Sequence, residues 1–207
     1  MELGNLAEWV LALSAVAASW QGILSLSAWR HEEGGRRRMK VAETALAEFY
    51  EARDIFKWVR SRALQPEESS DRPGREGETA GVQQQRDLYF PILKRLADDG
   101  EFFGRMRARR YRVLALFGPE AVAPYDLIEK VHGDIGTAAK MLIQTRQEGE
   151  TSKAEIARDA AWQDTVWDDA DHTDAINAII EKAVHVAEEI FRPEIVGREK
   201  SSSVISA

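Results

Sequence analysis

Cysteine is absent from this chain of 207 residues. Its absence excludes disulfides, thiolate nucleophiles and cysteine-bound metals, and it removes thiol usage as a guide to the cellular compartment. The sequence also lacks the glycine-rich phosphate loops and the nucleophile-elbow, zinc-protease and calcium-loop motifs. We therefore predict a protein that is not an enzyme, with no catalytic residue, cofactor or metal ligand assigned.

An excess of basic residues is missing as well. The formal net charge is −7 at pH 7. Proteins that bind nucleic acid broadly neutralise many phosphates with a basic face, so we do not expect a nucleic-acid partner.

Strand-like alternation, hairpin signals and internal repeats are also lacking. Apolar residues instead recur at spacings of three and four through most of the chain. The expected fold class is all-α, with an N-terminal transmembrane helix followed by an antiparallel helical bundle of about four main helices. Residues 39–193 are long enough to form one domain with a core of its own.

The N-terminal segment 1–29 is apolar. No charged residue occurs from Trp9 to Trp29. As a helix, the stretch from Trp9 to Trp29 would span about 30 Å, the thickness of a bilayer's hydrocarbon core. We predict a membrane anchor with Trp9, Trp20 and Trp29 in it, the two end indoles at headgroup level. The alternatives are a helix packed against protein and a cleaved signal, although the basic leader of a signal peptide is absent.

A basic juncture, 30–38, follows the apolar segment. Gly34 and Gly35 predict a hinge, and Arg36, Arg37 and Arg38 are expected to contact anionic lipid headgroups. The positive-inside rule then places the N-terminus outside and the remaining chain in the cytoplasm, at a bacterial inner membrane.

A homodimer through the anchor is one option. Small residues recur at every fourth position of the apolar segment, at Ser14, Ala18 and Gly22, which permits close approach of a second helix.

Helical periodicity and breaker residues divide the bundle. The clearest periodic pattern is an apolar seam with alternating spacings of three and four: Ala42, Ala45, Phe49, Ala52, Phe56, Val59 and Ala63. The charged residues of the same segment lie off this seam: Glu43, Glu48, Glu51, Asp54, Lys57 and Arg60. Residues 65–82 have the composition of a flexible loop. Further helices are expected from Asp87 with Pro91 in the first turn, with a fresh start after Asp99, and from Pro119 to about Gln147.

The C-terminal third has weaker signals. Segment 148–173 is acidic and weakly structured, with a capping box at Ser152 and Glu155 that starts a short helix near Lys153. A last helix is expected to stop at Pro193, followed by a disordered tail, 194–207.

Two acid–histidine pairs resemble half of a helical-bundle metal site: Glu129 with His132, and Asp169 with His172. The first helix offers no inward carboxylate to complete such a site, and His132 falls on an apolar seam. We interpret it as a core histidine, with a metal-dependent enzyme as the least favoured alternative.

Two clusters are candidates for binding a partner protein. Arg105, Arg109 and Arg112 share one helical face and could hold a phosphate or an acidic partner, or pair with acidic helices of the same bundle. Trp162 and Trp167, among aspartates, could form a binding edge or pack onto the bundle.

Two stretches resemble sequences in a set of bacterial proteins of unknown function. These stretches are "AEFYEARDIFKWVRSRAL", residues 47–64, and "RARRYRVLALFG", residues 107–118. The resemblance covers about the first 120 residues and implies one N-terminal membrane helix and a helical cytoplasmic region. The resemblance implies a bacterial or phage setting and carries no function. From the apolar segment, the basic juncture and the helical periodicity we expect a single-pass membrane-anchored cytoplasmic protein that acts as an interaction or scaffold module. The alternative is a soluble helical binding protein that buries its apolar helix in itself or in a partner.

Overall fold

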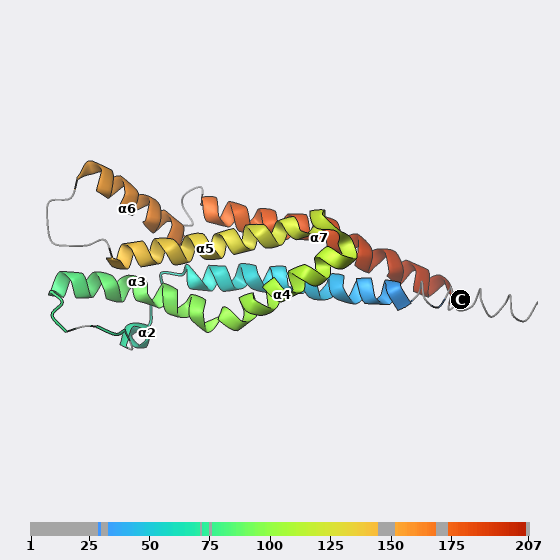
Figure 1. Cartoon of the computed structure of the whole chain (residues 1–207), viewed down its shortest axis with the longest axis horizontal. Helices are drawn as coiled ribbons and strands as arrows, with labels where there is room; N and C mark the ends of the chain where they lie inside the picture. Colours follow the sequence, from blue (N-terminus) through green and yellow to red (C-terminus); the bar gives the residue numbers. More distant parts are fainter. Residues whose placement is uncertain are drawn as a thin grey trace, which may run out of the picture.

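The computed structural model describes residue 29 and residues 33–70, 72–74, 76–144, 152–168 and 174–205, with side chains up to Val196. Within these ranges all regular structure is helical and no strand occurs, which confirms the predicted all-α class. The molecule is elongated, with its helices aligned along the long axis (Figure 1).

The described part begins with a helix over residues 33–59, here called the first helix. The labelled elements that follow are α2 (Pro66–Ser70), α3 (Ala80–Asp98), α4 (Gly100–Phe117), the 3-10 helix η1 (Pro119–Val122), α5 (Ala123–Gln144), α6 (Lys153–Val166) and α7 (Ala175–Ile205). None of the described helices combines the length and apolar character that a membrane span requires. The predicted anchor lies outside the described residues except for Trp29, as do Ser14, Ala18 and Gly22.

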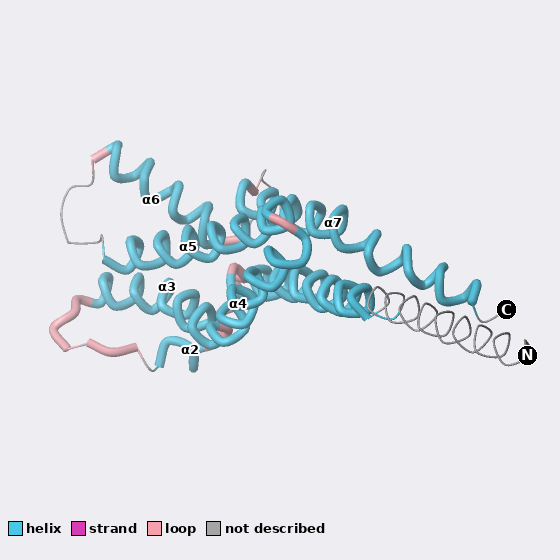
Figure 2. Tube along the Cα trace, turned by 45° about the vertical axis from the view of Figure 1, so that its right-hand side comes forward, coloured by secondary structure: helices cyan, strands magenta, loops and turns pink. Residues whose placement is uncertain are grey.

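Four helices pack antiparallel at one end of the molecule. The first helix runs against α4, because Arg38 contacts Leu116 near the end of α4, whereas Phe56 contacts Phe103 near its start. It also runs against α7, since Arg38 pairs with Glu194 while Arg60 bonds Asn177. The fourth member, α5, packs against α7 and runs beside α4 (Figure 2).

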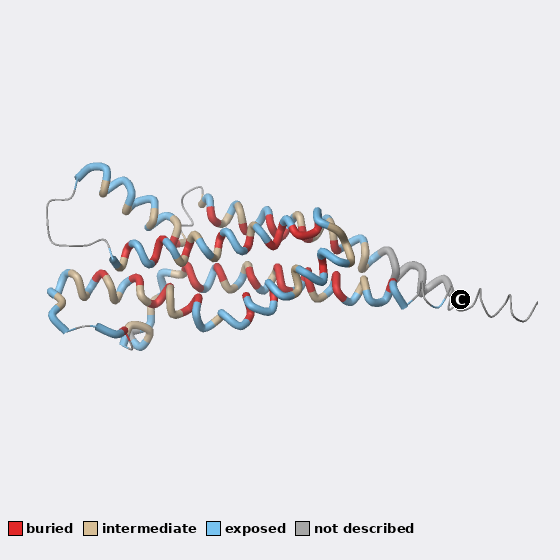
Figure 3. Tube along the Cα trace, in the orientation of Figure 1, coloured by how far each residue is buried: buried red, intermediate tan, exposed pale blue. Residues whose placement is uncertain are grey.

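The buried hydrophobic residues form one core cluster that includes residues of these four helices and also of α3 and α6. Figure 3 marks the buried positions along the backbone in red. The seam of the first helix is buried as predicted from Ala42 to Val59, and alternating alanines and phenylalanines let neighbouring helices approach. Ala63 is exposed, because the first helix ends at residue 59. Two of the charged residues predicted to lie off this seam, Glu48 and Arg60, are also buried.

The positions predicted for Pro91, in the first turn of a helix, and for Pro193, at the end of one, are both wrong. α3 begins at Ala80 and not at Asp87, so Pro91 lies in the helix interior, where it is buried against the core. α7 continues through Pro193 to Ile205, so the predicted tail has helical backbone to that point. Contacts after Pro193 hold this helix in place: Glu194 pairs with Arg38, and Ile195 packs partly on the core.

The predicted loop 65–82 contains the short helix α2 and a set of internal ion pairs. The buried guanidinium of Arg72 bonds Glu78 and, at 2.7 Å, Asp87. Hydrogen bonds from Arg72 and Arg86 lower the pKa of Glu78 to about 2. Composition indicated a mobile segment, but these pairings depend on residues of α3 that a local pattern does not include.

Two buried arginines close the ends of helices that lack a glycine cap. Arg95 of α3 donates to the carbonyl oxygen of Trp58, in the last turn of the first helix, and to those of Ser61 and Ala63 just after it. It also pairs with Glu68 of α2. Carbonyls at a helix C-terminus have no partner within the helix, so a cationic donor satisfies them.

Arg60 acts in the same way on α6. Its guanidinium donates to the carbonyl oxygens of Asp164, Thr165 and Trp167. It also lies 2.8 Å from the carboxylate of Asp174, the residue before α7. One fully buried side chain thereby joins the first helix, α6 and α7.

Candidate functional site

A basic cleft lies between the start of the first helix and the C-terminal half of α4. Its concave surface encloses about 370 Å³. It is lined by five cationic side chains, one carboxylate and two smaller residues: Arg36, Arg37, Lys40, Arg109, Arg112, Glu33, Val41 and Thr44. We call this surface the basic cleft.

Helical spacing explains why these residues meet. Arg36, Lys40 and Thr44 are four residues apart, so they share one face of the first helix, and Arg109 and Arg112 are three apart on α4. The antiparallel packing of the two helices then sets the two basic faces opposite each other. Buried Val41 forms the apolar floor between them.

Arg109 is fixed at the inner side of the cleft by Glu48. The Nε–H of Arg109 donates to both carboxylate oxygens of Glu48, each at 2.8 Å. Burial raises the pKa of Glu48, and the bond to Arg109 opposes that rise. Burial and the charge of Glu48 also raise the pKa of Tyr125. Arg109 is thereby held in place and its charge is partly balanced.

Three of the other cations in the cleft differ from most arginines that the structure describes. Among the residues that the structure describes, Arg37, Lys40 and Arg112 have no carboxylate within ion-pair distance. Elsewhere in the described bundle an arginine commonly pairs with an acid, as do Arg38, Arg60, Arg72, Arg86, Arg95, Arg105, Arg107, Arg110 and Arg192. At Arg37, Lys40 and Arg112 the basic cleft therefore concentrates positive charge that no described carboxylate pairs with, in a protein of net negative charge.

Residues predicted for lipid and for a partner are brought together here. Arg36 and Arg37, expected to contact headgroups, line the same cleft as Arg109 and Arg112, expected to bind a phosphate or a partner. Arg105 does not line it; this exposed side chain pairs with Glu101 one turn away on α4.

Arg38 has an internal role. Its guanidinium donates to the carbonyl oxygen of Leu116 at 2.8 Å, pairs with Glu194 at 2.6 Å and lies over the ring of Phe117. These contacts join the first helix, α4 and α7 beside the basic cleft.

The tryptophans expected to interact lie apart from the cleft. Trp167 is buried and packs near Tyr89 of α3, so it offers no surface to a partner, which corrects its candidacy as a binding residue. Trp162 of α6 packs partly on the core beneath Arg158. Trp29 is 62% exposed, and Trp9 and Trp20 lie outside the described residues.

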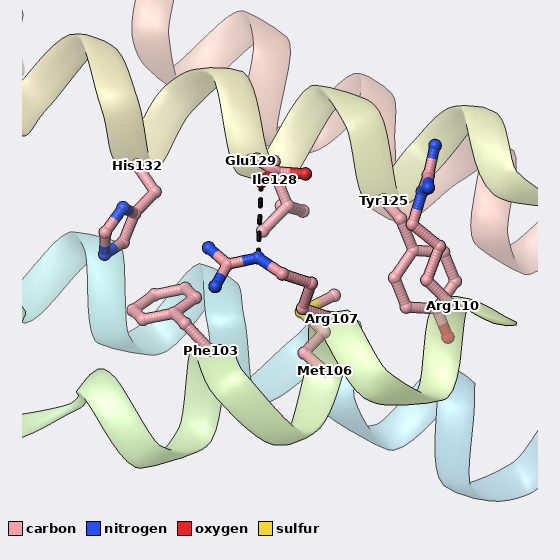
Figure 4. A pocket seen from close by; sticks show the side chains of 8 residues that line it. All are labelled: Phe103, Met106, Arg107, Arg110, Tyr125, Ile128, Glu129 and His132. Atoms are coloured by element: carbon pink, nitrogen blue, oxygen red, sulfur yellow. Dashed lines mark hydrogen bonds and ion pairs between the residues drawn. The ribbon is translucent and has the colours of Figure 1, made fainter.

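A second, much smaller pocket lies between α4 and α5 and holds one of the predicted acid–histidine pairs (Figure 4). Its volume of about 20 Å³ has room for roughly one water molecule. Glu129 is engaged by Arg107, and His132 packs edge-on against Phe103 with ring centroids 4.6 Å apart. Burial and the nearby Arg107 lower the pKa of His132, which favours its neutral form.

The described residues contain no group of three or more acidic or histidine side chains arranged to hold a metal ion. Asp169 and His172 lie outside these residues.

Sequence reasoning did not select Lys40, Thr44 and Glu33 for the site. The four-residue spacing from Arg36 to Lys40 and Thr44 could have indicated these two residues. The packing of α4 against this face of the first helix, which creates the cleft, is not visible in the sequence. Comparisons with protein-family models, curated proteins and solved structures give no match for this chain.

Proposed function

We propose that this chain is a single-pass, membrane-anchored protein whose helical bundle acts in the cytoplasm as an interaction or scaffold module. The observation that carries the proposal is the position of the basic cleft. Arg36 follows Trp29, the end of the uncharged segment, by seven residues, which reach at most about 25 Å even when fully extended. A cleft lined by Arg36 and Arg37 would thus lie close to the surface of a bilayer that the apolar segment spans.

Anchoring gives such a module two physical advantages. Confinement to a membrane raises its effective concentration toward partners on the same surface. Basic side chains near an anionic leaflet each gain about 1 kcal/mol, and the gain falls off within a Debye length. The antiparallel bundle supports the role, because it supplies a rigid frame for the cleft and for a protein partner.

Membrane insertion and orientation are tested together in bacterial cells that express the chain with a C-terminal tag. Membranes are washed with alkali, and intact spheroplasts are treated with protease before and after lysis. We expect the protein to remain in the washed membrane and the tag to be cleaved only after lysis. Release by the alkaline wash would contradict the anchor and favour the soluble alternative, in which the apolar segment packs on protein. Cleavage of the tag in intact spheroplasts would reverse the proposed orientation.

A further inference from the structure

We infer that the basic cleft is a binding site for a phosphate-bearing anion, held between the first helix and α4. The site unites residues that the sequence assigned to two separate roles, and the inference goes beyond the anchored scaffold proposed above. Only the membrane source of the anion rests on that proposed function.

The basic cleft holds more positive than negative charge. The cleft gathers Arg37, Lys40 and Arg112 around one concavity, and its single lining carboxylate, Glu33, forms no ion pair with them. This excess of like charge costs electrostatic free energy, because like charges repel. The chain has more acidic than basic residues, and carboxylates pair with most of the other arginines that the structure describes. No such carboxylate among the described residues pairs with these three cations. A bound anion would supply the missing negative charge.

The hydrogen-bond donors that line the cleft suit a phosphate group. Guanidinium groups present two parallel N–H donors that match the oxygens of a phosphate group, and a lysine adds a mobile point charge. Glu48 accepts only from the Nε–H of Arg109, so within the described contacts the terminal nitrogens of that side chain keep their donors. An anion in the cleft would therefore meet donors from both helices.

Size and surroundings restrict the ligand. A volume of about 370 Å³ falls in the range of small-ligand sites and suits a lipid headgroup or a phosphorylated small molecule. A long polyanion such as nucleic acid is disfavoured, because further along the first helix an acidic concavity is lined by Glu51, Asp54, Asp98 and Asp99. The ligand class is therefore a compact phosphate, from a headgroup or from solution.

The test uses the full chain in neutral alkyl-maltoside micelles, titrated calorimetrically with inorganic pyrophosphate at low salt. We expect saturable binding with one site per chain. Arg37→Gln and Arg112→Gln should each weaken it about tenfold or more, because each removes a guanidinium that lines the cleft. Arg105→Gln is the matched control: the same charge is lost from an exposed position on α4 outside the cleft, so the affinity should change less than about twofold.

Two results would overturn the inference. One is absence of saturable pyrophosphate binding to the wild-type chain, provided that its helical circular dichroism is intact. The other is an equal loss of affinity in Arg105→Gln and Arg112→Gln, which would mean that only overall charge matters. Neither result depends on the anchor, so failure of the cleft and failure of the membrane proposal are distinguishable.

A second arm identifies the source of the phosphate. The same titration is made with the chain in nanodiscs of phosphatidylcholine, and in nanodiscs that also contain phosphatidate. If lipid headgroups occupy the cleft, the apparent pyrophosphate affinity is lower in the phosphatidate discs, and Arg112→Gln abolishes this difference. If the affinity is the same in both discs, the cleft takes its phosphate from a soluble compound. Either outcome retains the phosphate chemistry that the first arm establishes.

Discussion

At the scale of single residues, a buried and fully bonded charge contributes more to the stability of this fold than an ion pair on the surface does. Arg60 is fully buried and satisfies three carbonyl oxygens, Asn177 and the Asp174 carboxylate, whereas Arg105 makes one exposed pair within its own helix. Removing one partner of a buried charge leaves the others unpaired in a medium of low dielectric constant, whereas an exposed pair contributes little.

We therefore expect Arg60→Met to lower the free energy of unfolding by about 3–5 kcal/mol. Lys57→Met is the control, because Lys57 is exposed in the last turn of the first helix, shortly before Arg60, and its replacement should change stability by less than about 0.5 kcal/mol. Urea unfolding followed by circular dichroism compares the two variants. A loss below about 1 kcal/mol for Arg60→Met would contradict the role of this residue as the junction of three helices.

At the scale of elements, the turn between α4 and η1 depends on a backbone conformation that only glycine adopts readily. Gly118 has φ = 89° and ψ = 179°, and Pro119 follows as the first residue of η1. The sequence predicted this boundary correctly from its Gly-Pro pair. Ser152 was also predicted correctly as the cap of α6, and the capping box with Glu155 is present.

Replacement of Gly118 by alanine should lower the free energy of unfolding by about 1–3 kcal/mol, because a side chain is strained at this φ although nothing blocks the space. Gly104 is the matched control: it lies on the exposed face of α4, and an added Cβ would also meet nothing. Gly104→Ala should stabilise the protein by about 0.5–1 kcal/mol, because alanine loses less backbone entropy in a helix. Thermal unfolding of both variants measures the difference; the same sign for both would contradict the assigned strain.

Proline was the least reliable guide to these elements. Pro91 and Pro193 were read as a helix start and a helix stop, yet both lie inside helices. A proline removes one backbone hydrogen bond and costs about 3 kcal/mol in a helix interior. Tertiary contacts outweigh that cost here: Pro91 is buried in the core, and the turn after Pro193 is held by Glu194 and Ile195.

At the scale of the whole molecule, the last turns of α7 close the bundle end that carries the basic cleft. A chain that ends after Arg192 loses the Arg38–Glu194 pair and the contacts of Ile195, and should be less stable by about 1–2 kcal/mol. The ion pair supplies the smaller part of this loss, because both side chains are partly exposed and screened by solvent.

A chain that ends after Val196 is the control for this truncation, because it keeps both contacts and should unfold at the same urea concentration as the full chain. Equal midpoints for the two truncated chains would mean that α7 contributes nothing to this end of the bundle beyond Arg192.

The sequence by itself determined the helical class, the buried seam of the first helix, the turn at Gly118 and the cap at Ser152. Each of these depends on residues near one another in the chain, where periodicity and backbone preference act directly. Only the tertiary structure decided that Arg60 and Glu48 are buried, that Trp167 belongs to the core, and that Arg36, Arg37 and Lys40 line one cleft with Arg109 and Arg112. Those outcomes depend on which helices become neighbours, and a helix turned toward a partner can bury a charge that its own periodicity places in solvent.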